Sequence, residues 1–92
     1  MDKLEQVVQV KNKLGLHIRP ASYIVKLLTN ASCQVTLTYK GQSTNGRSVM
    51  GLMILAAPQN ALIKVSIEGV DAKETMDKLL KAFETEFGEN VE

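Results

Sequence analysis

Hydrophobic residues recur along the chain with two periods, one typical of strands and one typical of helices. Alternation rich in β-branched residues predicts strands over residues 4–10, 34–39 and 61–68. Spacing by three and four predicts a helix from residue 18, ended by residues 30–33. Its expected apolar face comprises Ile18, Ala21, Ile24, Val25 and Leu28. Pro20 falls in the first turn, where its missing N–H costs nothing.

Turn residues divide the middle of the chain into short elements. Lys40-Gly41 and Asn45-Gly46 are turn signals on either side of a short strand over residues 42–44. Ser48 is the predicted N-cap of a short helix that ends at Pro58. Two leucines of this helix can face a core, Leu52 and Leu55, and four residues are expected to face outward: Val49, Met50, Met53 and Ile54.

The most regular helical pattern follows the last strand. Asp71 and Glu74 form a capping pattern at its start, and Gly88 is placed to end it. Its apolar stripe comprises Ala72, Met76, Leu79, Leu80, Phe83 and Phe87. The predicted order is therefore βαββαβα. This is an α+β fold in which three helices cover one face of a four-stranded sheet and the other face is wet.

Length and charge narrow the class of protein. The 92 residues fit one domain over residues 1–92, with a globular composition of 45% hydrophobic and 23% charged residues. A net charge of +1 argues against a dedicated nucleic-acid binder. Residues 1–65 hold eight basic and two acidic residues (+6), whereas residues 66–92 hold three basic and eight acidic ones (−5). This split predicts one basic face.

Several other classes are excluded by simple counts. Cys33 is the only cysteine, so no intrachain disulfide can form, and we expect a small buried hydrophobe. The apolar runs are shorter than the roughly 20 residues of a membrane span, and no signal-peptide pattern is visible. We therefore expect a cytoplasmic protein without metal, cofactor, membrane or nucleic-acid partner.

His17 is the only histidine and stands directly before a predicted helix, two residues from Arg19. The first N–H groups of a helix lack intrahelical partners and attract anions. Arg19 offers a guanidinium fork for phosphate oxygens, and imidazole is a competent nucleophile. A phosphoryl group on His17 could be held by both. The same spacing also fits a surface histidine that serves as a loop residue or a weak cap.

Ser48 also has two interpretations. A plain N-cap is common and contributes about 1 kcal/mol. A phosphorylation site is the second, because a cap hydroxyl is exposed and a phosphate interacts well with a helix N-terminus. Position alone favours the plain cap.

Two segments carry the most specific signal, and each surrounds one of these residues. They are Gly15-Leu16-His17-Ile18-Arg19-Pro20-Ala21 and Asn45-Gly46-Arg47-Ser48-Val49-Met50-Gly51-Leu52-Met53. At this separation they resemble the HPr family, the histidine-containing phosphocarrier proteins of the bacterial phosphoenolpyruvate:sugar phosphotransferase system. The resemblance covers essentially the whole chain and implies an open-faced sandwich with an antiparallel sheet. It implies that His17 accepts a phosphoryl group from enzyme I and passes it to an EIIA-type acceptor.

The resemblance assigns further roles in a monomeric carrier that is not an enzyme. Arg19 would steady the phosphoryl group and Pro20 would shape the helix start. The docking surface for partners would comprise Ile18, Arg19, Lys26, Arg47, Val49, Met50 and Met53. Ser48 matches a serine that a dedicated kinase phosphorylates in some members, so a serine kinase/phosphorylase is a further expected partner. We also expect Arg19, Lys26 and Arg47 to ring His17.

Two kinds of observation leave alternatives to the sugar-linked carrier open: departures from the family pattern, and other classes of protein that the sequence fits. Ile18 is bulkier than the residue in many members, and Ala56-Ala57-Pro58 is more typical of nitrogen-related or purely regulatory branches of the system. A regulatory module that docks through phosphorylated Ser48 is one rival, although the presence of His17 favours the carrier. An RNA-binding module on the open sheet face is another, disfavoured because the chain has only two Tyr and two Phe.

Overall fold

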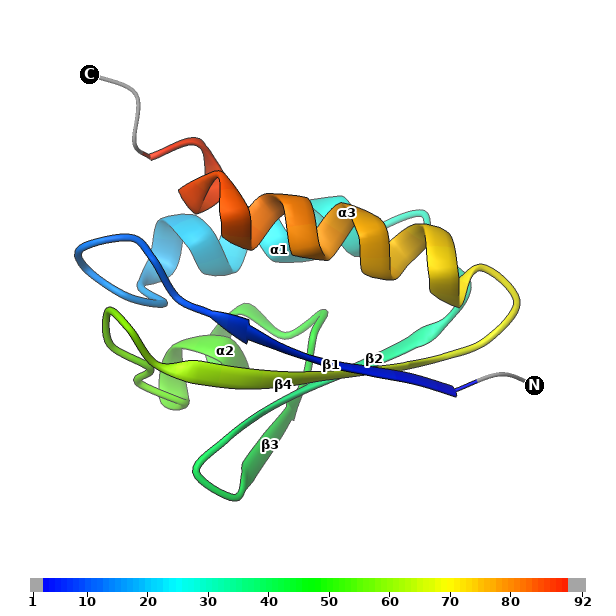
Figure 1. The fold of residues 1–92 in the computed structure, drawn as a ribbon, viewed down its shortest axis with the longest axis horizontal. Coiled ribbons are helices and arrows are strands. Elements are labelled where there is room, and N and C mark those ends of the chain that lie inside the picture. Colours follow the sequence, from blue (N-terminus) through cyan, green and yellow to red (C-terminus); the bar gives the residue numbers. More distant parts are fainter. Residues whose placement is uncertain (1–2, 90–92) are drawn as a thin grey trace.

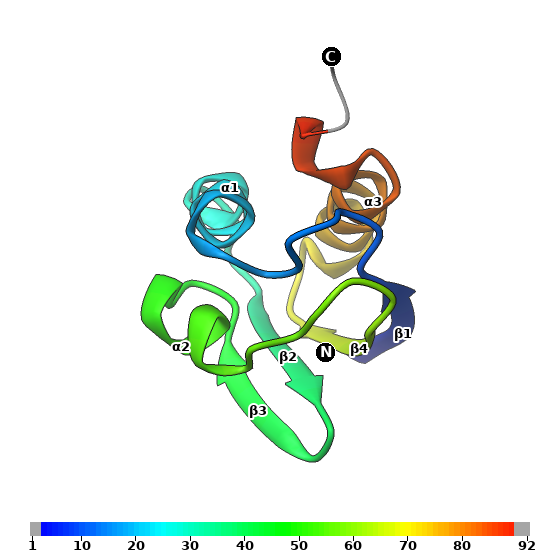
Figure 2. The ribbon, with the colours of Figure 1, turned by 90° about the vertical axis from the view of Figure 1, so that its left-hand side faces the viewer.

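The computed structural model describes residues 3–89, which form one antiparallel sheet with helices on one of its faces (Figures 1 and 2). The elements are β1 (Lys3–Gln9), α1 (Ile18–Leu28), β2 (Gln34–Tyr39), β3 (Gln42–Asn45), α2 (Val49–Ile54), β4 (Leu62–Glu68), α3 (Ala72–Glu84) and the 3₁₀ turn η1 (Glu86–Gly88). The strand order is β1-β4-β2-β3, with every neighbouring pair antiparallel. The predicted α+β open-faced sandwich is confirmed. Within residues 3–89 no helix is long and apolar enough to cross a membrane.

Alternation along the two central strands divides an inner face from an outer one. Val35 lies opposite Ile67 and Leu37 opposite Val65, and all four side chains are buried beneath the helices. The outer face carries polar side chains between them, among them Gln34, Thr36, Thr38, Lys64 and Ser66. Cys33 is buried, as expected of a small hydrophobe. The wet face that the alternation predicted is therefore present.

Helix α1 buries a narrower stripe than its spacing suggested. Pro20, Ala21, Ile24 and Leu28 are buried, whereas the side chain of Ile18 is 56% exposed. At about 100° per residue, Ile18 lies roughly a quarter turn away from the centre of the buried stripe. The prediction that Ile18 belongs to the core face is therefore wrong.

The start of α3 is held by a contact that the capping pattern did not predict. Asp71 is the N-cap residue but makes no side-chain cap hydrogen bond. Its Oδ2 instead accepts the backbone N–H of Ser32 at 2.8 Å, which holds the pKa of this carboxyl below its ordinary 3.8. The capping-box prediction is wrong because the carboxylate finds a donor on the loop between α1 and β2.

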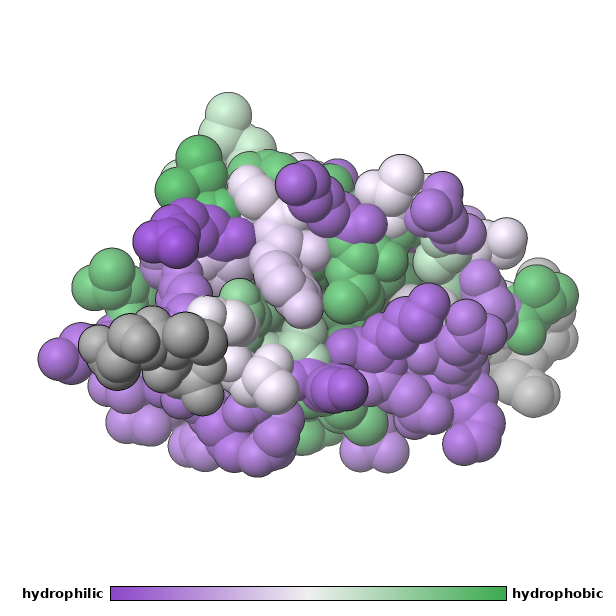
Figure 3. All heavy atoms as spheres, turned by 90° about the horizontal axis from the view of Figure 1, so that it is seen from above, coloured by the Kyte–Doolittle hydropathy of each residue, from purple (hydrophilic) through white to green (hydrophobic). Residues whose placement is uncertain are grey.

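Helix α3 also ends earlier than its apolar stripe. The helix stops at Glu84, and Glu86 and Phe87 have left-handed backbones with φ of 55° and 54°. Phe87 remains buried, so it joins the core from η1 rather than from the helix. The exposed face of α3 carries the Lys73–Asp77 and Lys78–Glu74 pairs. Seen from the helix side, the surface is accordingly mostly hydrophilic, with separate hydrophobic areas (Figure 3).

The loop before α1 is pinned against the segment after α2. Gly15 has a φ of +70°, and the backbone N–H of Leu16 donates to the carbonyl of Ala57 at 2.9 Å. A Cβ atom at Gly15 would lie 2.3 Å from that carbonyl oxygen. Only glycine allows so close an approach in this backbone conformation.

We expect Gly15→Ala to destabilise the protein by about 2–4 kcal/mol, because a left-handed alanine is strained and its methyl group meets the Ala57 carbonyl. The matched control is Gly41→Ala, at a φ of +79° with nothing within 4 Å of the added Cβ atom. That control should cost about 1–2 kcal/mol. Urea denaturation measures both, and equal losses would contradict the role of the close contact.

Candidate functional site

His17 has a fixed backbone and a side chain that takes no part in helix capping. It is the N-cap of α1, with φ −87° and ψ −169°, and makes no side-chain cap hydrogen bond. Its N–H donates to the carbonyl of Gly15 at 2.9 Å, and its carbonyl accepts the N–H of Ala21 at 3.1 Å. The side chain is 26% exposed. The chain therefore presents one imidazole at the start of a helix, on a residue whose backbone N–H and carbonyl are both hydrogen-bonded.

A hollow with several cations opens around this imidazole. Its lining comprises Lys11, Asn12, Lys13, Leu14, His17, Arg19, Gln59, Glu86, Gly88 and Glu89. Lys11 pairs with Glu84 at 2.6 Å. Among residues 3–89, no ion pair or side-chain hydrogen bond engages Lys13 or Arg19. Two unpaired cations and the first-turn N–H groups of α1 thus suit the hollow to an anion.

A carboxylate from the far end of the chain also enters this hollow. The Oε2 atom of Glu89 lies 3.0 Å from Nε2 of His17. Its Oε1 accepts a hydrogen bond from the side-chain amide of Asn12 at 3.1 Å, although the two residues are 77 positions apart. Neither Glu89 nor Asn12 was predicted from the sequence as part of a site. No local pattern could have found them, because the contact depends on how the turn after α3 folds back.

Arg47 does not lie where the charge argument placed it. Its guanidinium donates to the carbonyls of Cys33 at 3.0 Å and Ala31 at 2.6 Å, beyond the C-terminal end of α1. His17 stands at the opposite end of that helix. The expected ring of Arg19, Lys26 and Arg47 around His17 is therefore wrong for Arg47. The physical reason is that carbonyls left unpaired after a helix end attract a nearby guanidinium.

Lys26 lies further along α1 than His17, on the same exposed side as Arg19. The two cations share a second hollow, lined by Ile18, Arg19, Ser22, Tyr23, Lys26, Phe87, Gly88 and Glu89. Glu89 and Arg19 line both hollows. Lys26 is therefore a neighbour of the site rather than part of it.

Exposed apolar side chains gather on α2 and on the start of α1. The side chain of Met50 is 69% exposed, and Met53 and Ile54 are also exposed, whereas Leu52 and Leu55 are buried as predicted. Val49 departs from its prediction, because it packs in part against the core. The two helices contact each other and lie on the same side of the sheet (Figure 2). Leu14, which the sequence pattern did not mark, is 73% exposed and lines the His17 hollow.

Ser48 is the N-cap of α2, as predicted. Its Oγ accepts the backbone N–H of Gly51 at 2.9 Å, and the side chain is half-buried. The cap role is thus established by geometry. Met50, two residues further along the chain, is exposed.

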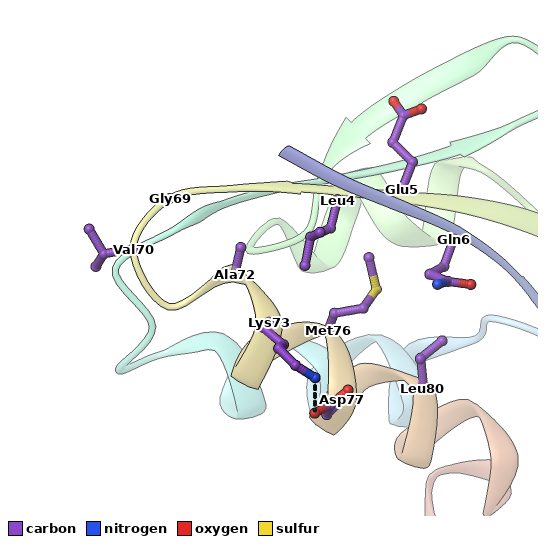
Figure 4. Close-up of a pocket in the computed structure, with 10 residues that line it drawn as sticks. All are labelled: Leu4, Glu5, Gln6, Gly69, Val70, Ala72, Lys73, Met76, Asp77 and Leu80. Carbon is purple, nitrogen blue, oxygen red and sulfur yellow. Dashed lines mark ion pairs between the residues drawn. The ribbon is translucent and has the colours of Figure 1, made fainter. Parts of the chain in front are cut away.

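Another groove lies beside the first half of α3, away from His17. Leu4, Met76 and Leu80 point into it, and the Lys73–Asp77 ion pair lies at its rim (Figure 4). None of the residues that line it is a histidine, cysteine or serine. The hollow around His17 is therefore the better candidate for chemistry.

Comparison with known proteins shows the family to which the chain belongs. A family model described as the phosphorylation site of the HPr component of the phosphotransferase system matches residues 4–85. The chain is 42% identical over 87 residues to the phosphocarrier protein HPr of Chlamydia trachomatis, covering 95% of this chain and 80% of that protein. It is 40% identical over 88 residues to the phosphocarrier protein HPr of Xylella fastidiosa, covering 96% and 99%.

Solved structures give the same result. The crystal structure of HPr from Thermoanaerobacter tengcongensis superposes with a TM-score of 0.90 at 35% identity, covering 96% of this chain and 99% of that one. Sequence and fold thus agree. The chain belongs to the HPr family, the phosphocarrier proteins of the phosphotransferase system.

Proposed function

We propose that His17 carries the phosphoryl group, which it takes from phosphorylated enzyme I and passes to an EIIA-type acceptor. The observation that carries this proposal is the position of the only histidine, partly exposed at the start of α1 in a hollow with two unpaired cations. Lys13 and Arg19 are well placed to offset phosphoryl charge. Pro20 is buried at the start of α1 and leaves the other first-turn N–H groups free.

The enclosed nitrogen of the imidazole supports one choice of acceptor atom. Nε2 of His17 is buried and faces Glu89. The exposed part of the ring therefore leaves Nδ1 as the atom that can meet a donor. In this proposal the lone pair of Nδ1 attacks phosphorus, and Arg19 contacts the phosphoryl oxygens in the product.

The docking surface in this proposal is the exposed apolar patch formed by Ile18, Met50 and Met53, with Lys26 beside it. Exposed methionine adapts to more than one partner surface, which suits a carrier that meets a donor and an acceptor in turn. The proposed surface also includes Val49, which packs in part against the core, and Arg47, which donates to the carbonyls of Ala31 and Cys33. One copy of the chain supplies both this patch and His17, and we propose that the carrier acts as a monomer.

Phosphorylation of Ser48 is proposed as the regulation of this carrier, by a serine kinase/phosphorylase. The hydroxyl lies at the N-cap of α2, two residues before Met50, whose side chain is exposed. A phosphate there adds a charge of about −2 to the docking patch. Repulsion from an acidic partner would then slow the exchange of phosphoryl groups.

One alternative is a nitrogen-related or purely regulatory branch of the system, in which the chain acts by docking on regulatory proteins. It rests on the segment Ala56-Ala57-Pro58. In the structure Ala56 has a left-handed φ of 53° at the end of α2, and Ala57 accepts the hydrogen bond from Leu16. This segment therefore has a structural role of its own, which accounts for its sequence without this branch.

Incubation with phosphoenolpyruvate and enzyme I should add one acid-labile phosphate to the protein, and His17→Ala should abolish it. Ser48→Ala is the control and should still be labelled. Mass spectrometry of intact protein measures both. Labelling of the His17→Ala protein would show that another residue accepts the phosphoryl group.

Arg19→Ala should slow phosphoryl transfer by at least about tenfold, because a charged donor beside the transferred group is lost. Lys26→Ala removes the same charge two turns further along α1 and should have a smaller effect. Both residues are exposed, so the fold should be retained. Rapid-quench kinetics with enzyme I measures the rates, and equal effects of the two variants would remove Arg19 from the mechanism.

Ser48→Asp should weaken binding to enzyme I, because it places a negative charge in the docking patch. Ser48→Ala loses the cap hydroxyl without adding charge, and should cost about 1 kcal/mol of stability with little change in affinity. Calorimetric titration with enzyme I separates the two effects. Equal affinity of the two variants would leave Ser48 with its cap role alone.

A further inference from the structure

The contact between Glu89 and His17 belongs to a row of three side chains, Asn12, Glu89 and His17, which we call the relay. It begins at the buried amide of Asn12. Asn12 is 1% exposed, and its Nδ2 donates both to the carbonyl of Gly15 at 2.6 Å and to Oε1 of Glu89 at 3.1 Å. Both neighbours are acceptors, so the amide must present its NH₂ group to them. Asn12 therefore fixes one oxygen of the Glu89 carboxylate, and the other oxygen faces His17.

The turn that places Glu89 is anchored in the core. The Phe87 ring is buried and makes edge-to-face contacts with Phe83 at 4.9 Å and Tyr23 at 6.0 Å between ring centroids. Left-handed backbones at Glu86 and Phe87 are needed to reach this position. Non-glycine residues adopt them only where the surroundings enforce them. The position of Glu89 is thus set by packing and not by a free chain end.

The short distance between Nε2 and Oε2 bears on which nitrogen of the neutral imidazole carries the hydrogen. The two atoms are 3.0 Å apart, both are buried, and within residues 3–89 neither is aligned in a hydrogen bond with any group. The carboxylate therefore acts through its negative charge, which disfavours a lone pair on the nearby Nε2 and favours a hydrogen there. The lone pair of the neutral ring then falls on Nδ1.

We propose that Glu89 is a positioning residue, which keeps the hydrogen of His17 on Nε2 and leaves the lone pair of Nδ1 for the phosphoryl group. This inference rests on the proposed function for its catalytic meaning, whereas the protonation of the ring can be measured without it. Glu86 lies in the same hollow without contacting the imidazole in an ion pair, and Lys11, Lys13 and Arg19 complete its charged groups.

The relay also suits the transfer step. The bond from phosphorus to the donor atom of enzyme I breaks, and its electron pair stays on that atom. The lone pair of Nδ1 forms the new bond to phosphorus, while Nε2 keeps its hydrogen. No proton has to leave the ring, which becomes cationic as the bond forms. The Glu89 carboxylate faces that developing positive charge at 3.0 Å from Nε2.

Glu89→Gln tests this role, because Asn12 dictates how the new amide must turn. The NH₂ group of Asn12 will bind the amide oxygen of the variant side chain, so the amide NH₂ will face Nε2. The predicted result is an inversion, in which Nε2 becomes the acceptor and the hydrogen moves to Nδ1. Glu86→Gln is the matched control, since it removes one charge from the same hollow without touching the relay.

Two measurements on the full chain decide the matter. Long-range ¹H–¹⁵N correlation spectra of the unphosphorylated protein should show hydrogen on Nε2 in wild type and in Glu86→Gln, and on Nδ1 in Glu89→Gln. Phosphorylation by enzyme I should then be about threefold to fivefold slower in Glu89→Gln alone, the effect expected from a partly exposed charge pair.

Each failure has a distinct meaning. Hydrogen on Nε2 in the Glu89→Gln protein would overturn the positioning role, whatever the kinetics. An inverted tautomer with an unchanged transfer rate would overturn its part in the reaction. If wild type itself takes no phosphate on His17, the proposed function fails, while the spectra still test whether Glu89 sets the tautomer.

Discussion

The loop that carries His17 is held against residues 57–61 by backbone hydrogen bonds, and the site depends on this attachment. Val10 exchanges hydrogen bonds with Ala61 at 2.9 Å and Asn60 at 2.6 Å, and Leu16 donates to Ala57 at 2.9 Å. Backbone groups pulled from water must find such partners, so the two segments cannot separate cheaply. The loop thereby delivers His17 to the start of α1 with its backbone already fixed.

Charge around the imidazole comes from both halves of the chain. The basic segment, residues 1–65, supplies Lys13 and Arg19. The acidic segment, residues 66–92, folds back through η1 and supplies Glu89. The site is therefore a mixed one rather than a plain basic pocket. The cations that line the hollow suit a phosphoryl group, and in our proposal the carboxylate beside Nε2 keeps a hydrogen on that atom. The net charges of the two halves alone gave no sign of this arrangement.

The short helix α2 shows how one element can serve the core and a surface at once. Leu52 and Leu55 pack inward, which leaves Met50 and Met53 exposed next to the start of α1. The Ser48 cap fixes where this helix begins. Because six residues cannot form a stable helix alone, the cap and the inward leucines together hold the exposed methionines in place.

Much of the fold and the chemistry was already determined by local sequence. Alternation placed β2 at its observed bounds, Ser48 was recognised as a cap, and the motif around His17 identified the carrier family. These features depend on residues close together in the chain. Their periodicity and spacing can be read directly from the sequence. Only the tertiary structure decided which groups the long side chains contact and where the segment after α3 folds back. Arg47 turned to the carbonyls after α1, Asp71 bound Ser32, and Glu89 reached His17. Each of these contacts joins groups distant in sequence, and packing of separate elements determines which polar groups become neighbours.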